Sequence, residues 1–118
     1  MKSKPLEALM QPLEQLRRPD PLIEVTTALV FIRVALQPGI RITEIKRQLN
    51  LTRPAAHRHI ALLTKEGDVG RRGVNTRGLG LVMRKSDPTD GRAKCLYLTS
   101  KGKALARTVV HPHATELQ

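Results

Sequence analysis

Two short helical patterns joined by a tight turn constrain the fold of this chain more than any other feature of its sequence. The first covers residues 42–49, and Asn50 follows it as a turn residue. The second is predicted over residues 53–65, with Thr52 as its N-cap and Gly67 as its left-handed stop. Apolar residues recur at helical spacing in both, at Ile42, Ile45 and Leu49 and then at Ala56, Ile60 and Leu63. Two short helices connected in this way predict a helix-turn-helix.

Two further helices are predicted before this motif. The first is amphipathic, with a kink or break at Pro12, and its apolar residues are Leu6, Leu9, Met10, Leu13 and Leu16. The second runs from Pro21 to Leu36, with Asp20 as its N-cap and Pro21 at the first helical position. We expect one stripe of this helix to carry the apolar residues Leu22, Val25, Leu29, Ile32 and Leu36.

A hairpin pattern follows the motif. Residues 68–78 are rich in Gly and Arg, and their apolar residues show neither the spacing of a helix nor the alternation of a strand, which predicts a loop. Residues 79–86 and 92–99 have the character of strands. The DPTDG sequence between them predicts a turn, with Pro88 at its second position and Gly91 at a positive φ. The two strands therefore predict a small hairpin that leans on the helices.

Helical spacing resumes over residues 100–110 and is stopped by Pro112. The order of elements predicts a mainly α fold with a small β-hairpin, which is a winged helix-turn-helix. With 118 residues, one domain is expected. Its parts are an N-terminal helix over residues 1–19, a winged-helix core over 20–107 and a C-terminal tail over 108–118.

The charge of the chain is concentrated in its middle. The sequence holds 21 Lys and Arg against 10 Asp and Glu, a formal net charge of +11. Residues 41–94 carry 13 of these basic and 5 of the acidic residues, so they account for +8. This localisation favours a nucleic-acid surface over an anionic membrane, which would be bound by a basic amphipathic helix. Aromatic residues are only 2%, too few for a base-stacking platform, so duplex grooves are favoured over single strands.

The remaining composition excludes several classes of function. Cys95 is the only cysteine, so no intramolecular disulfide and no paired-cysteine zinc site is expected, and a buried thiol is favoured. We expect no cofactor and no metal. No nucleophile–base arrangement, carboxylate pair or phosphate-binding glycine loop is evident, so an enzyme is not expected. Acidic residues and a proline interrupt the apolar residues at the N-terminus, so no signal peptide is expected, and no apolar stretch is long enough to span a membrane. The single cysteine fits a reducing compartment, and we expect a cytoplasmic, nucleoid-associated protein.

Two segments carry a family resemblance. PGIRITEIKRQLNLTRPAAHRHIALLTKEG and DPTDGRAKCLYLTSKGKAL resemble the MarR family of bacterial winged-helix transcription regulators. The second segment is the more specific, and it matches at Asp87, Pro88, Asp90, Gly91, Arg92, Leu98, Thr99 and Gly102. The resemblance covers about residues 21–107, with an insertion at about residues 70–80 before the wing. It implies binding to double-stranded DNA, and helices at the two ends of the chain that build a homodimer.

The second helix of the motif supplies the candidate residues for base contacts. Arg53, His57 and Arg58 lie on its outward face, where a recognition helix presents side chains to the major groove. Ala55 on the same face would allow close approach or touch a thymine methyl. The alternative is that Arg53 and Arg58 contact only phosphate or solvent. His59 on the inward face is expected to be a packed, hydrogen-bonded core residue.

Arg92 at the tip of the hairpin is the candidate for a minor-groove contact, and the resemblance implies the same role. Asp87 and Asp90 are expected to cap the turn through backbone N–H groups and so to orient Arg92. The alternative is a plain solvated turn. Further residues are expected to hold phosphates and to position the protein without specifying sequence, namely Thr43, Lys46, Arg47, Thr52, Arg84, Lys85 and Lys94.

Three arginines of the insertion stay open between an extended DNA footprint and a mobile basic loop, namely Arg71, Arg72 and Arg77. The function expected first is that of a sequence-specific regulator that binds double-stranded DNA as a homodimer. The alternative is an adaptor in which the winged helix binds a protein, such as polymerase or a replication factor, with only nonspecific DNA affinity. A binder of structured RNA is a third, weaker hypothesis.

Overall fold

The computed structural model describes residues 1–69, 75–76 and 78–111. Five helices fall within these residues: α1 (Lys4–Arg17), α2 (Val25–Leu36), α3 (Ile42–Gln48), α4 (Arg53–Leu63) and α5 (Ser100–Val110). The strands are β1 (Ile40–Arg41), β2 (Asp68–Val69), β3 (Asn75–Thr76), β4 (Val82–Ser86) and β5 (Lys94–Leu98). Strands β1, β5 and β4 form an antiparallel sheet in that order, and β2 pairs with β3. The predicted winged helix-turn-helix, mainly α with a small β-hairpin, is confirmed.

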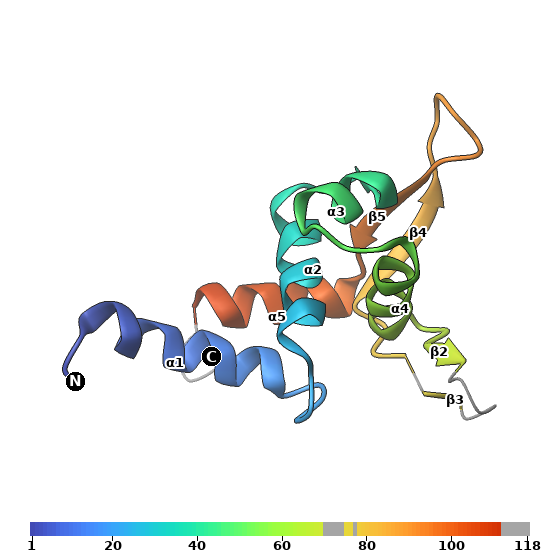
Figure 1. Cartoon of the computed structure of the whole chain (residues 1–118). Helices are drawn as coiled ribbons and strands as arrows, with labels where there is room; N and C mark the ends of the chain where they lie inside the picture. The colour runs from blue at the N-terminus through green and yellow to red at the C-terminus, as the bar shows by residue number, and fades with distance from the viewer. Residues whose placement is uncertain (70–74, 77, 112–118) are drawn as a thin grey trace.

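The core lies where α2, α3 and α4 meet the sheet. Val30 and Val34 of α2, Ile45 of α3, Ile60 of α4 and Leu96 of β5 have no exposed surface. Figure 1 shows α1 extending away from this core beside α5, while the β4–β5 hairpin projects from the other end of the molecule. The hairpin and the α3–α4 pair therefore lie together, remote from the N-terminus.

Local signals position the helix-turn-helix. Asn50 turns the chain at a φ of 53°, a left-handed conformation that asparagine tolerates, as the sequence predicts. Thr52 caps α4, because its hydroxyl oxygen accepts a hydrogen bond from the Ala55 N–H at 3.2 Å. The expected stop at Gly67 is wrong: its φ is 75°, but α4 already ends at Leu63.

The end of α4 is fixed by a later segment of the chain. Residues 79–81 return to the helix, where the Leu79 N–H donates to the Leu62 carbonyl at 3.0 Å and the Leu81 N–H donates to the Leu63 carbonyl at 2.8 Å. The Gly80 N–H donates to the Thr64 carbonyl at 3.3 Å. Because these bonds take the last carbonyls of α4, the helix ends before the predicted boundary at residue 65.

Helix α2 begins later than predicted and faces the other way. Asp20 caps a turn instead of the helix, since its carboxylate accepts from the Leu22 N–H at 3.0 Å. Most of the predicted stripe faces outward: Leu22, Val25, Leu29 and Leu36 are exposed, with exposed fractions of 88%, 75%, 45% and 69%. Ile32 is the exception, because it is partly buried and packs against the core. The core instead receives Thr27, Ala28, Val30, Phe31 and Val34. The helix is apolar on both faces, so periodicity alone did not identify the inward one. We call Val25, Leu29 and Leu36 the α2 stripe.

Helix α1 is one uninterrupted helix with Pro12 inside it, so the predicted break is absent. Leu16 is its buried residue, and the helix packs against α5. Its other apolar residues are half exposed, with exposed fractions between 52% and 58% at Leu6, Leu9, Met10 and Leu13. We call these four residues the α1 stripe. An amphipathic helix was expected, and most of its apolar side faces solvent.

The hairpin gains a third strand that the sequence analysis missed. Strand β1 pairs with β5, with Ile40 opposite Leu96 and Arg41 opposite Cys95. Cys95 is buried, as expected. The predicted turn forms, with the Asp90 N–H donating to the Asp87 carbonyl at 3.3 Å, but Gly91 does not have a positive φ.

The predicted loop at residues 68–78 contains the β2–β3 pair, so it is not entirely irregular. Arg71, Arg72 and Arg77 lie outside the described residues, as does the tail at 112–118. The predicted final helix is α5, capped by the Thr99 hydroxyl, which accepts from the Gly102 N–H at 3.0 Å. A side chain at Gly102 would collide with the Leu81 carbonyl, so only glycine permits this close approach. None of the described helices is long and apolar enough to cross a membrane.

Candidate nucleic-acid interface

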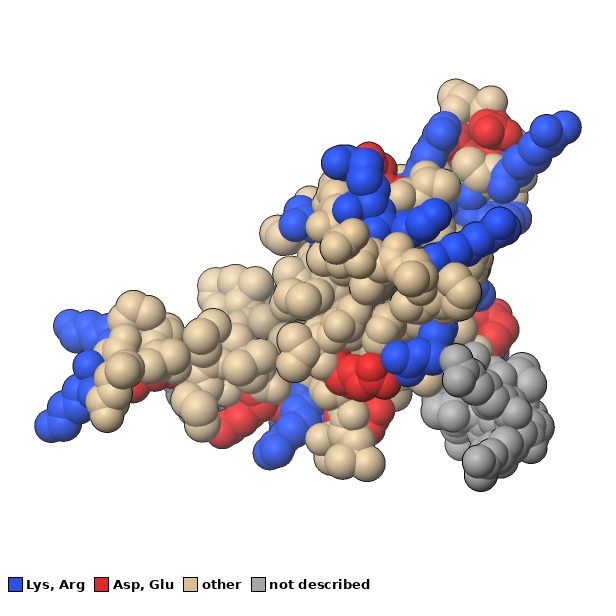
Figure 2. Space-filling view, in the orientation of Figure 1, with Lys and Arg blue, Asp and Glu red and all other residues tan. Residues whose placement is uncertain are grey.

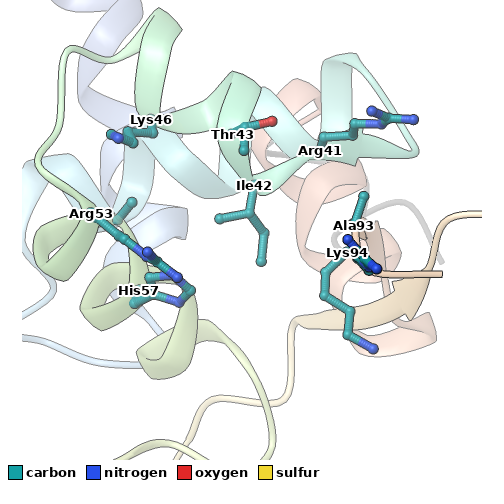
Figure 3. A pocket seen from close by; sticks show the side chains of 10 residues that line it. Arg41, Ile42, Thr43, Lys46, Arg53, His57, Ala93 and Lys94 are labelled. Atoms are coloured by element: carbon teal, nitrogen blue, oxygen red, sulfur yellow. The ribbon is translucent and has the colours of Figure 1, made fainter. Parts of the chain in front are cut away.

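A cleft of about 390 Å³ separates the helix-turn-helix from the wing (Figure 3). We call it the basic cleft. Its lining residues come from β1, α3, α4 and the β5 side of the hairpin: Arg41, Ile42, Thr43, Lys46, Arg53, Ala56, His57, Arg92, Ala93 and Lys94. These ten residues bring together segments that are up to 53 positions apart in the sequence, between Arg41 and Lys94.

The lining carries positive charge and no carboxylate. Five of the ten residues are Lys or Arg, one is histidine, and none is Asp or Glu. Figure 2 shows Lys and Arg gathered over α3, α4 and the wing, whereas the α1 end of the molecule carries charges of both signs. Side walls of one sign concentrate the field between them, so the cleft attracts a polyanion.

The first turns of α4 present two of the predicted base readers to the cleft. Arg53 and His57 are exposed, lie one helical turn apart and both line it. In Figure 3 their side chains lie next to each other on one wall. Ala55 is half-buried and is not part of the lining, in which Ala56 takes part instead.

The third predicted reader, Arg58, lies outside the lining and is held by α2. Its two terminal nitrogens bind the Glu24 carboxylate in a bidentate ion pair, with Nη1–Oε1 at 2.8 Å and Nη2–Oε2 at 3.0 Å. This hydrogen bonding lowers the pKa of Glu24 below its ordinary value. The structure thus assigns Arg58 an intramolecular partner that the sequence analysis missed, and its contact with DNA stays a prediction.

Beside Arg58, the His59 ring is buried and hydrogen-bonded, as the sequence predicts. Its Nδ1 lies 2.8 Å from the Thr27 hydroxyl oxygen, and its Nε2 lies 3.4 Å from Arg58 Nη2. Burial lowers the pKa of His59, and the neighbouring charge of Arg58 lowers it further. Since the guanidinium can only donate, the neutral ring accepts at Nε2 and carries its proton at Nδ1 toward Thr27.

The wing turn is organised by its two aspartates in the geometry expected of them. The Asp87 carboxylate accepts from the Thr89 N–H at 2.8 Å and from the Thr89 hydroxyl at 2.7 Å. The Asp90 carboxylate accepts from the Arg92 N–H at 3.1 Å. These bonds fix the backbone from which the exposed Arg92 side chain projects. Whether Arg92 enters a minor groove stays a prediction.

Arg41 is a residue of this site that the sequence analysis missed. Its Nε donates to Asp87 Oδ2 at 2.7 Å, which joins β1 to the base of the wing. The bonds from Thr89, followed by Arg41, hold the pKa of Asp87 well below its usual range. The sequence signal for the role of Arg41 was weak, because β1 has two residues and pairs with a strand more than fifty positions later.

The expected phosphate contacts fall into different environments. Thr43, Lys46 and Lys94 line the basic cleft, and Lys94 Nζ also donates to the Ser86 hydroxyl at 3.0 Å. Arg47 pairs with Glu44 on its own helix at 2.9 Å, and the Thr52 hydroxyl is engaged in capping α4. These residues lie close to the cleft without all sharing it.

The two remaining candidates lie on the outer strand β4. Lys85 Nζ stands 5.3 Å from the centre of the Tyr97 ring, a cation–π arrangement. Arg84 lines a separate groove with Lys65 and Glu66, where the end of α4 meets β4. Among the residues that the structure describes, no group of three or more His, Cys, Asp and Glu side chains is placed to hold a metal ion.

No family model matches the chain, and no curated protein matches it in sequence. Solved structures match its fold. A transcriptional regulator from Thermotoga maritima has a TM-score of 0.70 at 18% identity, over 95% of this chain and 68% of that one. A crystal structure of MarR gives 0.63 at 15% identity, over 90% of this chain and 66% of that one. A mutant MarR from E. coli complexed with operator DNA has a TM-score of 0.64 at 20% identity, over 96% of this chain and 70% of that one.

The chain therefore spans about two thirds of the length of these structures, between 66% and 70%. At these identities the likeness concerns the fold, which includes α1 and the wing as well as the helix-turn-helix. This chain has a winged helix-turn-helix fold, similar to those of solved transcription regulators that include MarR.

Proposed function

We propose that this protein is a transcription regulator that binds double-stranded DNA in a sequence-specific manner. The observation that carries the proposal is the basic cleft, in which a recognition helix and a wing face each other across five cationic side chains and no carboxylate. A protein of similar fold has been solved in complex with operator DNA, which supports the proposal that this fold binds DNA here as well. We expect it to act on chromosomal DNA in the cytoplasm.

In the proposed complex the first turn of α4 enters the major groove. Arg53 and His57 then reach base edges, because they are exposed at the end of the helix that faces the cleft. Lys46 and Lys94 stand on opposite walls, where they meet phosphates on the two sides of the groove. The positive N-terminus of α4 adds to this attraction.

The wing supplies the second contact. Arg92 projects from a turn that Asp87 and Asp90 hold in place, and it reaches the adjacent minor groove in the proposed complex. The negative potential of a narrow, A·T-rich minor groove favours an inserted arginine. Asp87 does not repel DNA strongly, because its charge is balanced by Arg41 within the protein.

We further propose a homodimer formed by the N- and C-terminal helices. The α1 stripe exposes four apolar side chains at helical spacing, and Val110 is exposed at the end of α5, which packs against α1. Covering this surface removes apolar area from water. A twofold dimer would place two recognition helices on half-sites about one helical turn apart, roughly 34–36 Å.

Selection of bound sequences from a random duplex pool, followed by fluorescence anisotropy over a salt series, tests the proposal. A regulator keeps a preferred sequence at about 150 mM salt, typically about 10³-fold or more above bulk DNA. The adaptor alternative predicts that affinity for all sequences falls together, and competition with duplex RNA tests the third hypothesis. The Arg92→Ala variant should bind the selected site more weakly and lose its preference for an A·T-rich flank. Unchanged affinity and preference would remove Arg92 from the interface.

A further inference from the structure

Glu24 occupies the junction between the N-terminus of α2 and the flank of the recognition helix. We propose that Glu24 is a specificity-determining residue: it competes with DNA phosphates for Arg58 and so suppresses binding to arbitrary sequences. This inference rests on the proposed function and concerns the same helix. It assigns a role to an acidic side chain that contacts a candidate DNA-binding arginine.

The geometry of the pair suits a competitor. A carboxylate and a phosphate both offer two oxygens to a guanidinium, and Glu24 already uses both of its oxygens on Arg58, at 2.8 and 3.0 Å. The side chains are 50% and 42% exposed, so an incoming phosphate can reach Arg58 without opening the core. Glu24 and Arg58 can therefore exchange partners at the surface of the folded protein.

The position of Glu24 commits its carboxylate to this pair. Glu24 is the N-cap residue of α2, with φ of −74° and ψ of 147°, but its side chain makes no capping hydrogen bond. The carboxylate is thus turned from its own helix toward α4. The Arg58 hydrogen bonds also lower the pKa of Glu24 below its ordinary value, which is the direction expected of a carboxylate held in this pair.

Arg58 is placed so that the exchange matters for DNA. It follows His57, which lines the basic cleft, and successive helical residues are about 100° apart around the axis. Arg58 therefore lies on the flank of α4 next to the groove-facing side, where a groove wall would bring a phosphate. Behind it, the neutral ring of His59 does not compensate its charge.

The competition acts on nonspecific binding first. A phosphate that takes Arg58 leaves Glu24 unpaired beside a polyanion, so gain and loss nearly cancel on an arbitrary sequence. On the preferred sequence, Arg53, His57 and Arg92 hold the complex in register, and its affinity depends less on Arg58. Glu24 thereby increases the ratio between specific and nonspecific affinity.

The test is the Glu24→Gln variant, measured by anisotropy on the selected site and on a scrambled duplex of the same length. On the scrambled duplex we expect affinity to rise about two- to fivefold, the size of an exposed charge pair. The slope of log K against log salt should steepen by about 0.9, corresponding to one more phosphate contact. Affinity for the selected site should rise less, so the specificity ratio falls.

Two controls separate this effect from net charge and from folding. Glu7→Gln makes the same charge change on α1, whose N-terminal end lies far from α4 in Figure 1, and should leave the specificity ratio unchanged. In an Arg58→Ala background, Glu24→Gln should have no effect on the salt slope, because no guanidinium remains to be released. Thermal unfolding of each variant verifies that the proteins compared are folded.

Three results would overturn the inference while leaving the proposed function intact: an unchanged scrambled-duplex affinity in Glu24→Gln, an equal shift in Glu7→Gln, or an equal shift in the Arg58→Ala background. Failure of the wild-type protein to bind any duplex would instead overturn the proposed function, and the role of Glu24 with it. The wild-type titration therefore distinguishes the two failures.

Discussion

The basic cleft and the α1 stripe both face solvent, yet they differ in what a single copy of the chain provides. The cleft is assembled within one chain: Thr52 caps its helix, Asp87 and Arg41 fix its wing, and its lining brings together five Lys and Arg residues. The α1 stripe consists of apolar side chains that remain about half exposed among the described residues. Exposed charge is a stable surface in water, whereas exposed apolar area is stabilised by a partner. In the proposed function, the first region binds DNA as it stands in one chain, and the second is covered by another copy of the chain.

The largest effect, on the stability of the proposed dimer, is expected from a substitution in the α1 stripe that leaves the basic cleft unchanged. Leu9→Glu places a charge among the four exposed apolar residues of α1. In a twofold interface the change occurs twice, so at about 2 kcal/mol per site the dimer is weakened by about 4 kcal/mol. Sedimentation or light scattering over a range of concentrations should show monomer in place of dimer.

Gln11→Glu is the matched control, because it adds the same charge to an exposed position about 200° around the same helix. It should leave the dimer unchanged. If wild-type protein is already monomeric, or if Leu9→Glu dissociates no better than the control, the stripe is not the dimer interface.

The reverse experiment damages the cleft and spares the stripe. Arg53→Ala removes the exposed side chain that begins α4 and should cost about 1–3 kcal/mol of binding free energy on the selected DNA site. Its mass in solution should remain that of the wild type. Arg18→Ala, at the C-cap of α1, removes the same charge from a residue that does not line the cleft and serves as control. An equal loss on every sequence would make Arg53 a phosphate contact rather than a base contact.

A smaller effect concerns the buried hydrogen bond between Thr27 of α2 and His59 of α4. The pKa of His59 is lowered from its ordinary value of 6.5 by burial, so the unfolded chain takes up a proton at a higher pH than the folded protein. Stability is therefore fully present above about pH 6.5 and falls as the pH drops through the window between that value and the folded pKa, by at most about 1.4 kcal/mol per pH unit for one proton.

His59→Gln should remove this slope, as measured by urea unfolding at several pH values, although the variant is less stable overall. Glu24 titrates in a separate window, since its pKa lies below the ordinary value of 4.5 and its contribution is lost only in stronger acid. A slope of unchanged size in His59→Gln would show that another group titrates.

The smallest expected change is in the wing. Asp87→Asn keeps an oxygen that can accept from Thr89 but loses the charge that pairs with Arg41. The wing should become less fixed, and affinity for the selected site should fall about two- to fivefold. Asp20→Asn, which alters an aspartate that caps a turn away from the wing, should bind as the wild type does. Equal binding by both variants would show that the Arg41 pair is not needed to hold the wing.

Features encoded by neighbouring residues were predictable from the sequence. Asn50 and Thr52 act through groups within three positions, so the helix-turn-helix was placed correctly, and the wing turn followed from Asp87 and Pro88 in the same way. The buried, bonded state of His59 was also predictable, since the residue interrupts an apolar face of α4.

Features that depend on distant partners were not predictable. The Glu24–Arg58 pair joins residues 34 positions apart, and the Arg41–Asp87 pair joins residues 46 apart, with no periodic signal for either. The inward face of α2 was misassigned because apolar residues occupy both faces, and only packing against α4 and β5 selects between them. Strand β1 was not predicted, because a strand of two residues is too short to show the alternation of apolar and polar residues.

The return of the chain to the end of α4 has a practical consequence. Leu79 and Leu81 bind the carbonyls of Leu62 and Leu63, so the chain leaves and re-enters the fold at nearly the same place. The number of residues between these points is then not dictated by the core, and replacement of residues 70–74 with a tag or fluorophore-bearing peptide should leave the winged helix intact. Residues 79–81, where the chain returns to the fold, are hydrogen-bonded to the C-terminal end of α4, the helix proposed to enter the major groove, and are not among the residues that line the basic cleft.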